Sequence, residues 1–245
     1  MKKAFITGAN KSIGFETARQ LLQKGYFVYL GSRSIDNGNE AVKKLKAERL
    51  NNVEAIQIDV TSQESVTAAR AAKGKKTEVL DALINNAGIS GGLPQTATSM
   101  NIEVFKKVYD TNLFGVVMVT QAFLDLLHKS PEPRIVNVTS GLGSLTRNND
   151  PKWGYYNVKA AAYNSSKAAL NMYTIVLAYD LRDTPFKVNA VDPGYTATDF
   201  NHHSGTGTVE DAARRVVKCA MMADDGETSI FFSDDNSPET GISPW

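Results

Sequence analysis

Short apolar runs alternate with longer amphipathic segments along most of the chain. KKAFIT precedes a helical pattern from about residue 13, YFVYLG precedes one around residue 40, and NVEAIQID precedes one after residue 61. The order continues with VLDALINN, a helical stretch over about 101–128, RIVNVTS, another helix, FKVNAVD, a helix from about residue 208, and TSIFF. This alternation predicts βαβ units and about seven strands.

Consecutive βαβ units pair their strands in parallel through right-handed crossovers, and their helices cover both faces of the sheet. The pattern therefore predicts an α/β fold, with a single doubly wound Rossmann-type domain over residues 1–245 and a mostly parallel, seven-stranded sheet. Ligands of such folds bind beyond the carboxyl ends of the strands. Two long irregular stretches lie there, and we expect residues 141–162 and 195–207 to form substrate-side loops.

Composition narrows the classes of partner. The 27 lysines and arginines nearly balance the 26 aspartates and glutamates, so no overall field attracts nucleic acid or an anionic membrane. Cys219 is the only cysteine, which excludes an internal disulfide, and no apolar stretch is long enough to span a bilayer. These features predict a cytoplasmic protein that acts on a small molecule. His128, His202 and His203 lack metal-ligand spacing, so no metal site is expected.

Tyr163 and Lys167 lie four residues apart in a helical pattern, which places both side chains on one helix face. An ammonium group beside a phenol favours the phenolate, so Lys167 is expected to lower the pKa of Tyr163 and suit it to acid–base chemistry. Tyr155 and Lys159 have the same spacing, and a surface helix also carries such a pair as a solvated stripe. The pair alone does not choose among these interpretations.

The segment ITGANKSIGFETA joins the first predicted strand to the first predicted helix. Backbone N–H groups and the helix dipole at such a position suit a pyrophosphate, with Gly8 permitting a tight turn and Gly14 close packing. The spacing does not match the usual dinucleotide fingerprint G-x-G-x-x-G, so an ordinary strand-to-helix turn stays an alternative.

This segment resembles the TGxxxGxG loop of the short-chain dehydrogenase/reductase family. Thr7, Gly8 and Gly14 match that loop, whereas Ser12 stands where the family has its middle glycine. Further motifs follow in the family's order: the pair Asp59 and Val60, the NNAG motif of Asn85, Asn86, Ala87 and Gly88, then Asn112, Ser140, and the pair Pro193 and Gly194. The resemblance thus spans most of the chain.

The register of these motifs selects one of the two Tyr–Lys pairs. Tyr163 stands 30 residues before Pro193, which is similar to the family's spacing, whereas Tyr155 lies eight residues farther away. The resemblance implies that Tyr163 protonates a carbonyl oxygen and Ser140 hydrogen-bonds it. It also implies that Lys167 lowers the tyrosine pKa and binds the nicotinamide ribose, and that Asn112 holds a water of a proton relay.

The resemblance also implies a cofactor-binding set, which reaches from the glycine loop to the segment after the sixth strand. Its members are Gly8, Lys11, Ser12, Ile13, Gly14, Arg33, Asp59, Val60, Asn86, Ala87, Gly88, Tyr163, Lys167, Pro193, Gly194, Thr196 and Thr198.

Charge after the second strand predicts which nicotinamide cofactor is used. An NAD site places an acidic residue there for the ribose, whereas NADP needs a cation for its 2′-phosphate. Ser32 stands at that position and Arg33 follows it, while Lys11 in the glycine loop adds a second positive charge. We therefore expect NADPH/NADP+ as the cofactor, with two solvated surface cations as the alternative interpretation.

Two departures from the family's common pattern concern the substrate side. Ser140 and Tyr163 lie 23 residues apart, which indicates an insertion, and the C-terminal segment lacks the family's glycine-rich ending. Both features resemble the NADPH-dependent carbonyl reductase branch. Aromatic residues of the insertion and of the segment after Pro193 predict an apolar substrate pocket. The substrate-binding candidates are Trp153, Tyr156 and Tyr195, with Tyr155 and Phe200 nearby in sequence.

These observations predict an NADPH-dependent oxidoreductase that reduces a ketone or aldehyde to an alcohol. An alcohol dehydrogenase or a 3-oxoacyl reductase of the same family is an alternative, and so is a binding module that senses NADP without catalysis. The presence of all four catalytic-type residues favours the enzyme. The natural substrate, the reaction direction and the formation of a homo-oligomer are left open at this point.

Overall fold

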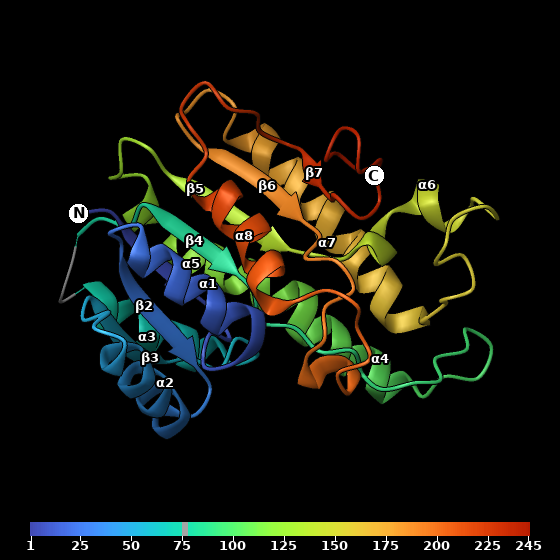
Figure 1. Ribbon diagram of the computed structural model, residues 1–245, viewed down its shortest axis with the longest axis horizontal. Helices are drawn as coiled ribbons and strands as arrows, with labels where there is room; N and C mark the ends of the chain where they lie inside the picture. Colours follow the sequence, from blue (N-terminus) through green and yellow to red (C-terminus); the bar gives the residue numbers. More distant parts are fainter. Residues whose placement is uncertain (75–77) are drawn as a thin grey trace.

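The protein is built around one seven-stranded sheet in which every neighbouring pair of strands is parallel. The computed structural model describes residues 1–74 and 78–245 (Figure 1). The strands are β1 (Lys3–Ile6), β2 (Phe27–Ser32), β3 (Val53–Gln57), β4 (Ala82–Asn85), β5 (Arg134–Val138), β6 (Lys187–Val191) and β7 (Phe231–Phe232). Their order, β3-β2-β1-β4-β5-β6-β7, reverses between β1 and β4 and confirms the predicted doubly wound fold.

Helices cover both faces of this sheet. One face packs against α1 (Ser12–Gln23), α2 (Ile35–Ala47) and α8 (Val209–Ala220), which share one apolar cluster with the strands. The other face packs against α3 (Gln63–Gly74), α5 (Gly115–Leu127) and α7 (Ala161–Asp180), which share a second cluster. No helix in the described part of the chain is long and apolar enough to cross a membrane.

The alternation of side chains along β1 shows how one short strand serves both layers. Ala4 and Ile6 belong to the first cluster, and Phe5 belongs to the second, where its ring lies 4.6 Å from that of Phe123. All three β1 side chains are fully buried. Apolar runs with no polar alternation are typical of parallel strands covered on both faces, and this is why KKAFIT is recognisable as a strand.

The predicted helix over residues 101–128 is not continuous. It consists of α4 (Ile102–Tyr109), a π-helical turn (Asp110–Phe114) and α5, because the N–H of Gly115 bonds to the carbonyl of Asp110, five residues back. A Cβ at Gly115 would lie 2.9 Å from the carbonyl oxygen of Val60, so only glycine lets the helix approach β3's connection this closely. The turn leaves Asn112 fully buried.

The two predicted substrate-side loops contain short helical turns. Residues 141–162 hold a 3₁₀ turn (Gly141–Gly143) and α6 (Leu145–Asn148), and α7 already begins at Ala161; a second 3₁₀ turn (Asp199–Asn201) lies within 195–207. The C-terminal residues fold back onto α6, as Thr146 donates to the carbonyl of Trp245 through both N and Oγ1 (3.2 and 2.9 Å). The inserted segment is therefore packed against the end of the chain.

Candidate active site

The catalytic-type residues gather where β4, β5 and β6 end. Ser140 lies two residues beyond β5, Pro193 lies two residues beyond β6, and α7 supplies Tyr163 and Lys167 from the neighbouring layer. The Lys167 ammonium donates to the carbonyl of Val138 over 2.9 Å, which joins α7 to the last residue of β5. The parallel sheet thus brings together residues that are widely separated in sequence.

The Ser140 side chain is a neighbour of the Tyr163 hydroxyl and lowers its pKa, although 23 residues separate the two in sequence. Burial raises the pKa of Tyr163 above its ordinary value, and the effect of Ser140 only partly offsets this rise. The expectation that Lys167 would lower this pKa is therefore wrong, because desolvation of the phenolate outweighs the other influences. Tyr163 stays protonated at neutral pH, which is the state a proton donor needs.

Lys167 is only 4% exposed, and burial lowers its pKa to about 8. The Asp192 carboxylate opposes this shift by favouring the charged form. The Lys167 Nζ atom lies 5.8 Å from the centre of the Tyr163 ring. A Cβ at Gly88 would lie 3.6 Å from the same Nζ atom, which places the NNAG motif directly beside the lysine.

Asp192 is a buried carboxylate at this site that the sequence reasoning missed. It accepts hydrogen bonds from Ser233 Oγ (2.7 Å) and from the N–H of Gly194 (3.0 Å), and also from the N–H of Gly141. Burial raises its pKa. These bonds tie the ends of β5, β6 and β7 together, and the available signal was an aspartate that directly follows the apolar run of β6.

The Asn112 side chain forms hydrogen bonds to two neighbouring segments. Its amide exchanges two hydrogen bonds with the backbone of Ile89, both 2.9 Å, and donates a third to Ser166 Oγ over 3.0 Å. The side chain thereby connects the segment after β4 to the helix that carries Tyr163. It positions these two segments relative to each other.

The glycine loop and the NNAG motif form one interlocked unit. Asn86 Nδ2 donates to the carbonyls of Thr7 (2.9 Å) and Gly8 (3.1 Å), and Thr7 Oγ1 accepts from the N–H groups of Asn86 and Ala87 (both 3.0 Å). Gly8 adopts φ +63°, and a Cβ at Gly14 would lie 2.5 Å from Asn86 Nδ2. Both glycines are therefore required by this packing.

Ser12 adopts φ +52° at the position where the family has a glycine. Left-handed backbone is strained for a residue with a side chain, so Ser12 occupies a position whose conformation favours glycine. In the described structure no side chain caps the N-terminus of α1 at Lys11. Free N–H groups with a positive helix dipole fit a pyrophosphate, and Ser12 and Ile13 lie at that helix start.

The two predicted 2′-phosphate cations come from different segments, Lys11 from the glycine loop and Arg33 from the end of β2. Arg33 is exposed directly after β2, while Ser32 is buried and donates to the carbonyl of Ser34 over 2.8 Å. Lys11 is exposed but forms an ion pair with Asp199 over 2.8 Å. This pair links the glycine loop to the segment after β6, which the sequence did not predict.

Asp59 and Val60, the predicted DV pair, lie two and three residues beyond the end of β3. The Asp59 carboxylate accepts from both N and Oγ1 of Thr61 (3.0 and 2.7 Å), and these bonds with the nearby Arg33 charge hold its pKa low despite burial. Val60 is 8% exposed.

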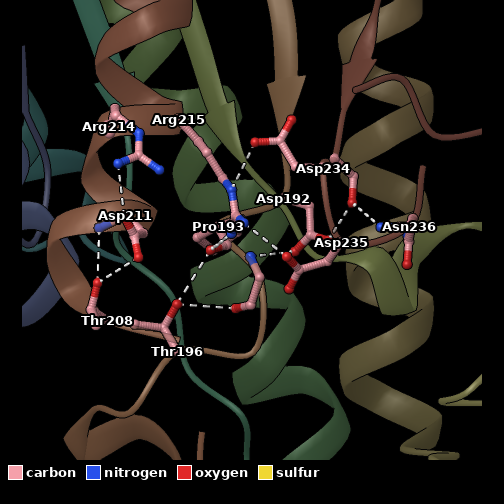
Figure 2. Close-up of polar contacts among 12 residues, drawn as sticks. Asp192, Pro193, Thr196, Thr208, Asp211, Arg214, Arg215, Asp234, Asp235 and Asn236 are labelled. Carbon is pink, nitrogen blue, oxygen red and sulfur yellow. Dashed lines mark hydrogen bonds and ion pairs between the residues drawn. The ribbon is translucent and has the colours of Figure 1, made fainter. Parts of the chain in front are cut away.

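The Pro193–Gly194 turn is held by Arg215 of α8. Arg215 donates to the carbonyl of Pro193 over 2.6 Å and pairs with both Asp234 and Asp235 beyond β7 (Figure 2). Gly194 adopts φ +82°, and a Cβ there would lie 2.4 Å from the Arg215 guanidinium. The turn therefore requires glycine, and the arginine fixes its direction.

Thr196 and Thr198 are the buried threonines that follow this turn. Thr196 Oγ1 donates to the carbonyls of Pro193 and Gly194, each over 3.2 Å, and Thr198 caps the 3₁₀ turn together with Asn201 (Figure 2 shows Thr196). Both side chains stabilise the start of the 195–207 segment.

Aromatic side chains from two segments meet on the substrate side. Trp153 packs edge-to-face on Tyr155 with ring centres 5.5 Å apart, and Tyr155 does the same with Tyr195 at 6.2 Å. Trp153 Nε1 also donates to Asn236 Oδ1 over 3.2 Å. Trp153 and Tyr195, two of the predicted substrate residues, therefore both contact Tyr155, and we call these three rings the aromatic row.

Phe200 and Tyr156 are the two other aromatic residues predicted near the substrate. Phe200 reaches the Tyr163 ring, with centres 5.5 Å apart. Tyr156 instead stacks with the Lys159 ammonium, which lies 4.5 Å from its ring centre. Among the described residues, no group of three or more histidine, cysteine, aspartate or glutamate side chains could hold a metal ion.

Comparison with known proteins identifies the class. Residues 2–208 match the family model for short chain dehydrogenases. A short-chain dehydrogenase of Penicillium roqueforti is 38% identical, and the match covers 88% of this chain and 86% of that protein. The chain belongs to the short-chain dehydrogenase family, whose members are oxidoreductases that use a nicotinamide dinucleotide, which confirms the family predicted from the motifs.

Two solved structures extend the comparison to the fold. Salutaridine reductase from Papaver somniferum is 31% identical with a TM-score of 0.82, covering 94% of this chain and 99% of that one. An NADPH-bound carbonyl reductase from chicken fatty liver is 26% identical with a TM-score of 0.84, covering 100% of this chain and 99% of that one.

Proposed function

We propose that this protein is an NADPH-dependent carbonyl reductase that converts a ketone or aldehyde to an alcohol. The observation that carries the proposal is the pairing of the Ser140 and Tyr163 side chains, with Lys167 on the same helix as Tyr163 and the NNAG motif beside that lysine. Two hydroxyl groups that converge at the carboxyl ends of the strands can both reach one substrate oxygen. The similarity to a salutaridine reductase and to a carbonyl reductase supports this chemistry.

In the proposed reaction, bound NADPH supplies the hydride. Tyr163 donates its proton to the carbonyl oxygen, and its raised pKa keeps that proton available at neutral pH. Ser140 donates a hydrogen bond to the same oxygen, where negative charge develops. Lys167, which donates to the carbonyl of Val138, would bind the nicotinamide ribose, and Asn112 fixes the segment after the NNAG motif.

NADPH as the preferred cofactor follows from charge. Arg33 is exposed and unopposed by an acidic residue at position 32, and the relative from chicken liver is NADPH-bound. A guanidinium offers a planar fork of donors that matches a phosphate. The remaining cofactor contacts are proposed for the NNAG motif, for Asp59 and Val60, and for the turn from Pro193 to Thr198.

The substrate is proposed to be an apolar carbonyl compound of some bulk. Phe200 packs against the proposed proton donor, and Tyr195 and Trp153 contact Tyr155 in a second group of aromatic rings. Aromatic walls with few polar groups bind apolar ligands and orient them through one or two hydrogen bonds. The ring of Tyr156, the third predicted substrate residue, faces the Lys159 ammonium.

A panel of activated ketones and aldehydes tests the proposal, with NADPH consumption as the readout. We expect turnover with at least some bulky ketones and a marked preference for NADPH over NADH. Arg33→Asp should reverse that preference, and unchanged NADPH affinity in this variant would refute the cofactor assignment. Tight NADPH binding without turnover of any carbonyl or alcohol would instead indicate a cofactor-sensing module.

A further inference from the structure

We infer that Gln95 is a positioning residue for Tyr163, because its side chain caps the first turn of α7 from a separate segment of the chain. The inference rests on the proposed function in one respect, namely that Tyr163 is the proton donor. Gln95 lies 68 residues before Tyr163 and is 3% exposed.

The first turn of α7 lacks a cap of its own. Ala160 precedes the helix and has no side-chain acceptor to offer. Gln95 supplies the missing acceptors: its Oε1 accepts from the N–H groups of Ala162 (3.1 Å) and Tyr163 (3.0 Å), and its backbone carbonyl accepts from Ala161 (3.1 Å). Unpaired amides at a helix start require such partners, and here one glutamine satisfies three consecutive ones, including that of the proton donor.

The nitrogen of the Gln95 side-chain amide also forms two hydrogen bonds. Its Nε2 donates to the carbonyls of Ser90 (2.5 Å) and Gly92 (2.7 Å). Gly91 between them adopts φ +81°, and a Cβ there would lie 2.5 Å from Val108. The turn of residues 90–92 is therefore wrapped closely around the glutamine amide.

The same segment begins at the NNAG motif, and Asn112 holds Ile89 by two hydrogen bonds. Gln95 thus connects the segment that follows Gly88, beside Lys167, to the backbone of Tyr163. A displacement of the phenol relative to the substrate oxygen by about 1 Å can lower the rate about 100-fold. Loss of this side chain should therefore act on the catalytic step more than on cofactor binding.

Replacing Gln95 with glutamate tests the two ends of its amide separately. It keeps an acceptor for the α7 amides and loses the two donors toward Ser90 and Gly92. Its carboxylate also adds a negative charge close to Tyr163, which disfavours the phenolate. A conservative variant and a truncated variant thus have different expected signatures.

The experiment compares Gln95→Ala and Gln95→Glu with Asn101→Ala, which removes the side-chain cap of α4 on Glu103 and serves as a matched loss of stability. We expect Gln95→Ala to lower kcat at least about tenfold with the NADPH dissociation constant within about twofold, and Asn101→Ala to retain kcat. Gln95→Glu should recover most of kcat, with its pH–rate profile shifted to higher pH.

Two results would overturn the inference: kcat of Gln95→Ala no lower than that of Asn101→Ala, or a Gln95→Glu pH profile identical to that of the unaltered protein. If Gln95→Ala does not fold, the glutamate profile alone decides. If the unaltered protein turns over no carbonyl, the proposed function fails, and hydrogen exchange still tests the cap. In that case the Ala162 and Tyr163 amides should exchange faster in Gln95→Ala than in the unaltered protein, whereas Gln95→Glu, which keeps the acceptor, should protect them. Unchanged exchange of both amides in Gln95→Ala would overturn the cap.

Discussion

The ring of Phe200 packs against the ring of Tyr163, with centres 5.5 Å apart and planes inclined by 58°. One ring comes from the 3₁₀ turn after β6 and the other from α7, so the segment 195–207 reaches the proposed proton donor directly. Phe200 is nevertheless 43% exposed. A half-exposed ring beside the reacting phenol is well placed to contact a bound substrate.

Replacing Phe200 with alanine should weaken the binding of bulky ketones more than that of small ones. An aromatic contact contributes about 0.5–1.5 kcal/mol beyond area burial, so we expect KM for an aromatic ketone to rise about two- to tenfold with little change in kcat. Phe114→Ala is the control, because that ring is similarly exposed but contacts Tyr109. If Phe200→Ala changed KM for bulky and for small ketones by the same factor, as we expect for Phe114→Ala, Phe200 would not belong to the substrate pocket.

Replacing Ser12 with glycine should stabilise the protein. Ser12 has φ +52°, where a side chain costs about 1 kcal/mol and glycine does not. We expect the free energy of unfolding in urea to rise by about 1 kcal/mol. Ser34→Gly is the matched control, because Ser34 caps α2 at φ −98° and its replacement should cost a few tenths of a kcal/mol. If Ser12→Gly lowered the free energy of unfolding as Ser34→Gly does, the backbone of Ser12 would not be strained.

The pH dependence of stability should report the burial of Lys167. Burial lowers its pKa to about 8 from 10.5, so the unfolded chain holds a proton that the folded chain releases between these values. The contribution of this group to the free energy of unfolding therefore rises with pH across that interval. Burial raises the pKa of the Cys219 thiol to about 12 from 9.0, which opposes the trend above pH 9.

Urea unfolding of the unaltered protein and of Lys167→Met, compared between pH 8 and 9, isolates this effect. The unaltered protein should gain about 1 kcal/mol per pH unit relative to the variant. Parallel curves for the two proteins would show that Lys167 is not desolvated in the folded state.

Removing the charge of Asp199 should release Lys11 for the cofactor phosphate. The two side chains form an exposed ion pair of 2.8 Å, and such pairs are weak. We expect Asp199→Asn to tighten NADPH binding by up to about fivefold and to leave NADH binding unchanged, as measured by fluorescence titration. Glu103→Gln breaks the comparable exposed pair with Lys106 and should change neither. An equal effect on both cofactors would place Lys11 away from the 2′-phosphate.

The fold was predictable because each strand is an apolar run closed by a polar or glycine-containing turn, as in KKAFIT before Gly8. The interruption of the 101–128 helix at Asn112 was not predictable. A change from i−4 to i−5 hydrogen bonding leaves the hydrophobic period almost unaltered over one turn. The close approach of Gly115 to Val60 accompanies this interruption. Local periodicity does not contain this long-range packing.

The site was predictable where short motifs carry the chemistry and not where distant segments complete it. Tyr163 and Lys167 were identified from spacing and register. Asp192 and Gln95 act through hydrogen bonds to residues 41 and 68 positions away, so nothing in their local sequence indicates those partners. The direction of the Tyr163 pKa shift was missed for a related reason, since burial is a property of the whole fold.

The most direct test of the account is the turnover of Tyr163→Phe beside that of Tyr155→Phe, with NADPH and the best ketone of the panel. Tyr155 has the same Tyr–Lys spacing and lies in the aromatic row, so its variant controls for the loss of a phenol hydroxyl near the site. We predict that Tyr163→Phe loses at least about 100-fold in kcat while binding NADPH normally, and that Tyr155→Phe retains kcat within about threefold. Substantial turnover by Tyr163→Phe would contradict the assignment of Tyr163 as the proton donor.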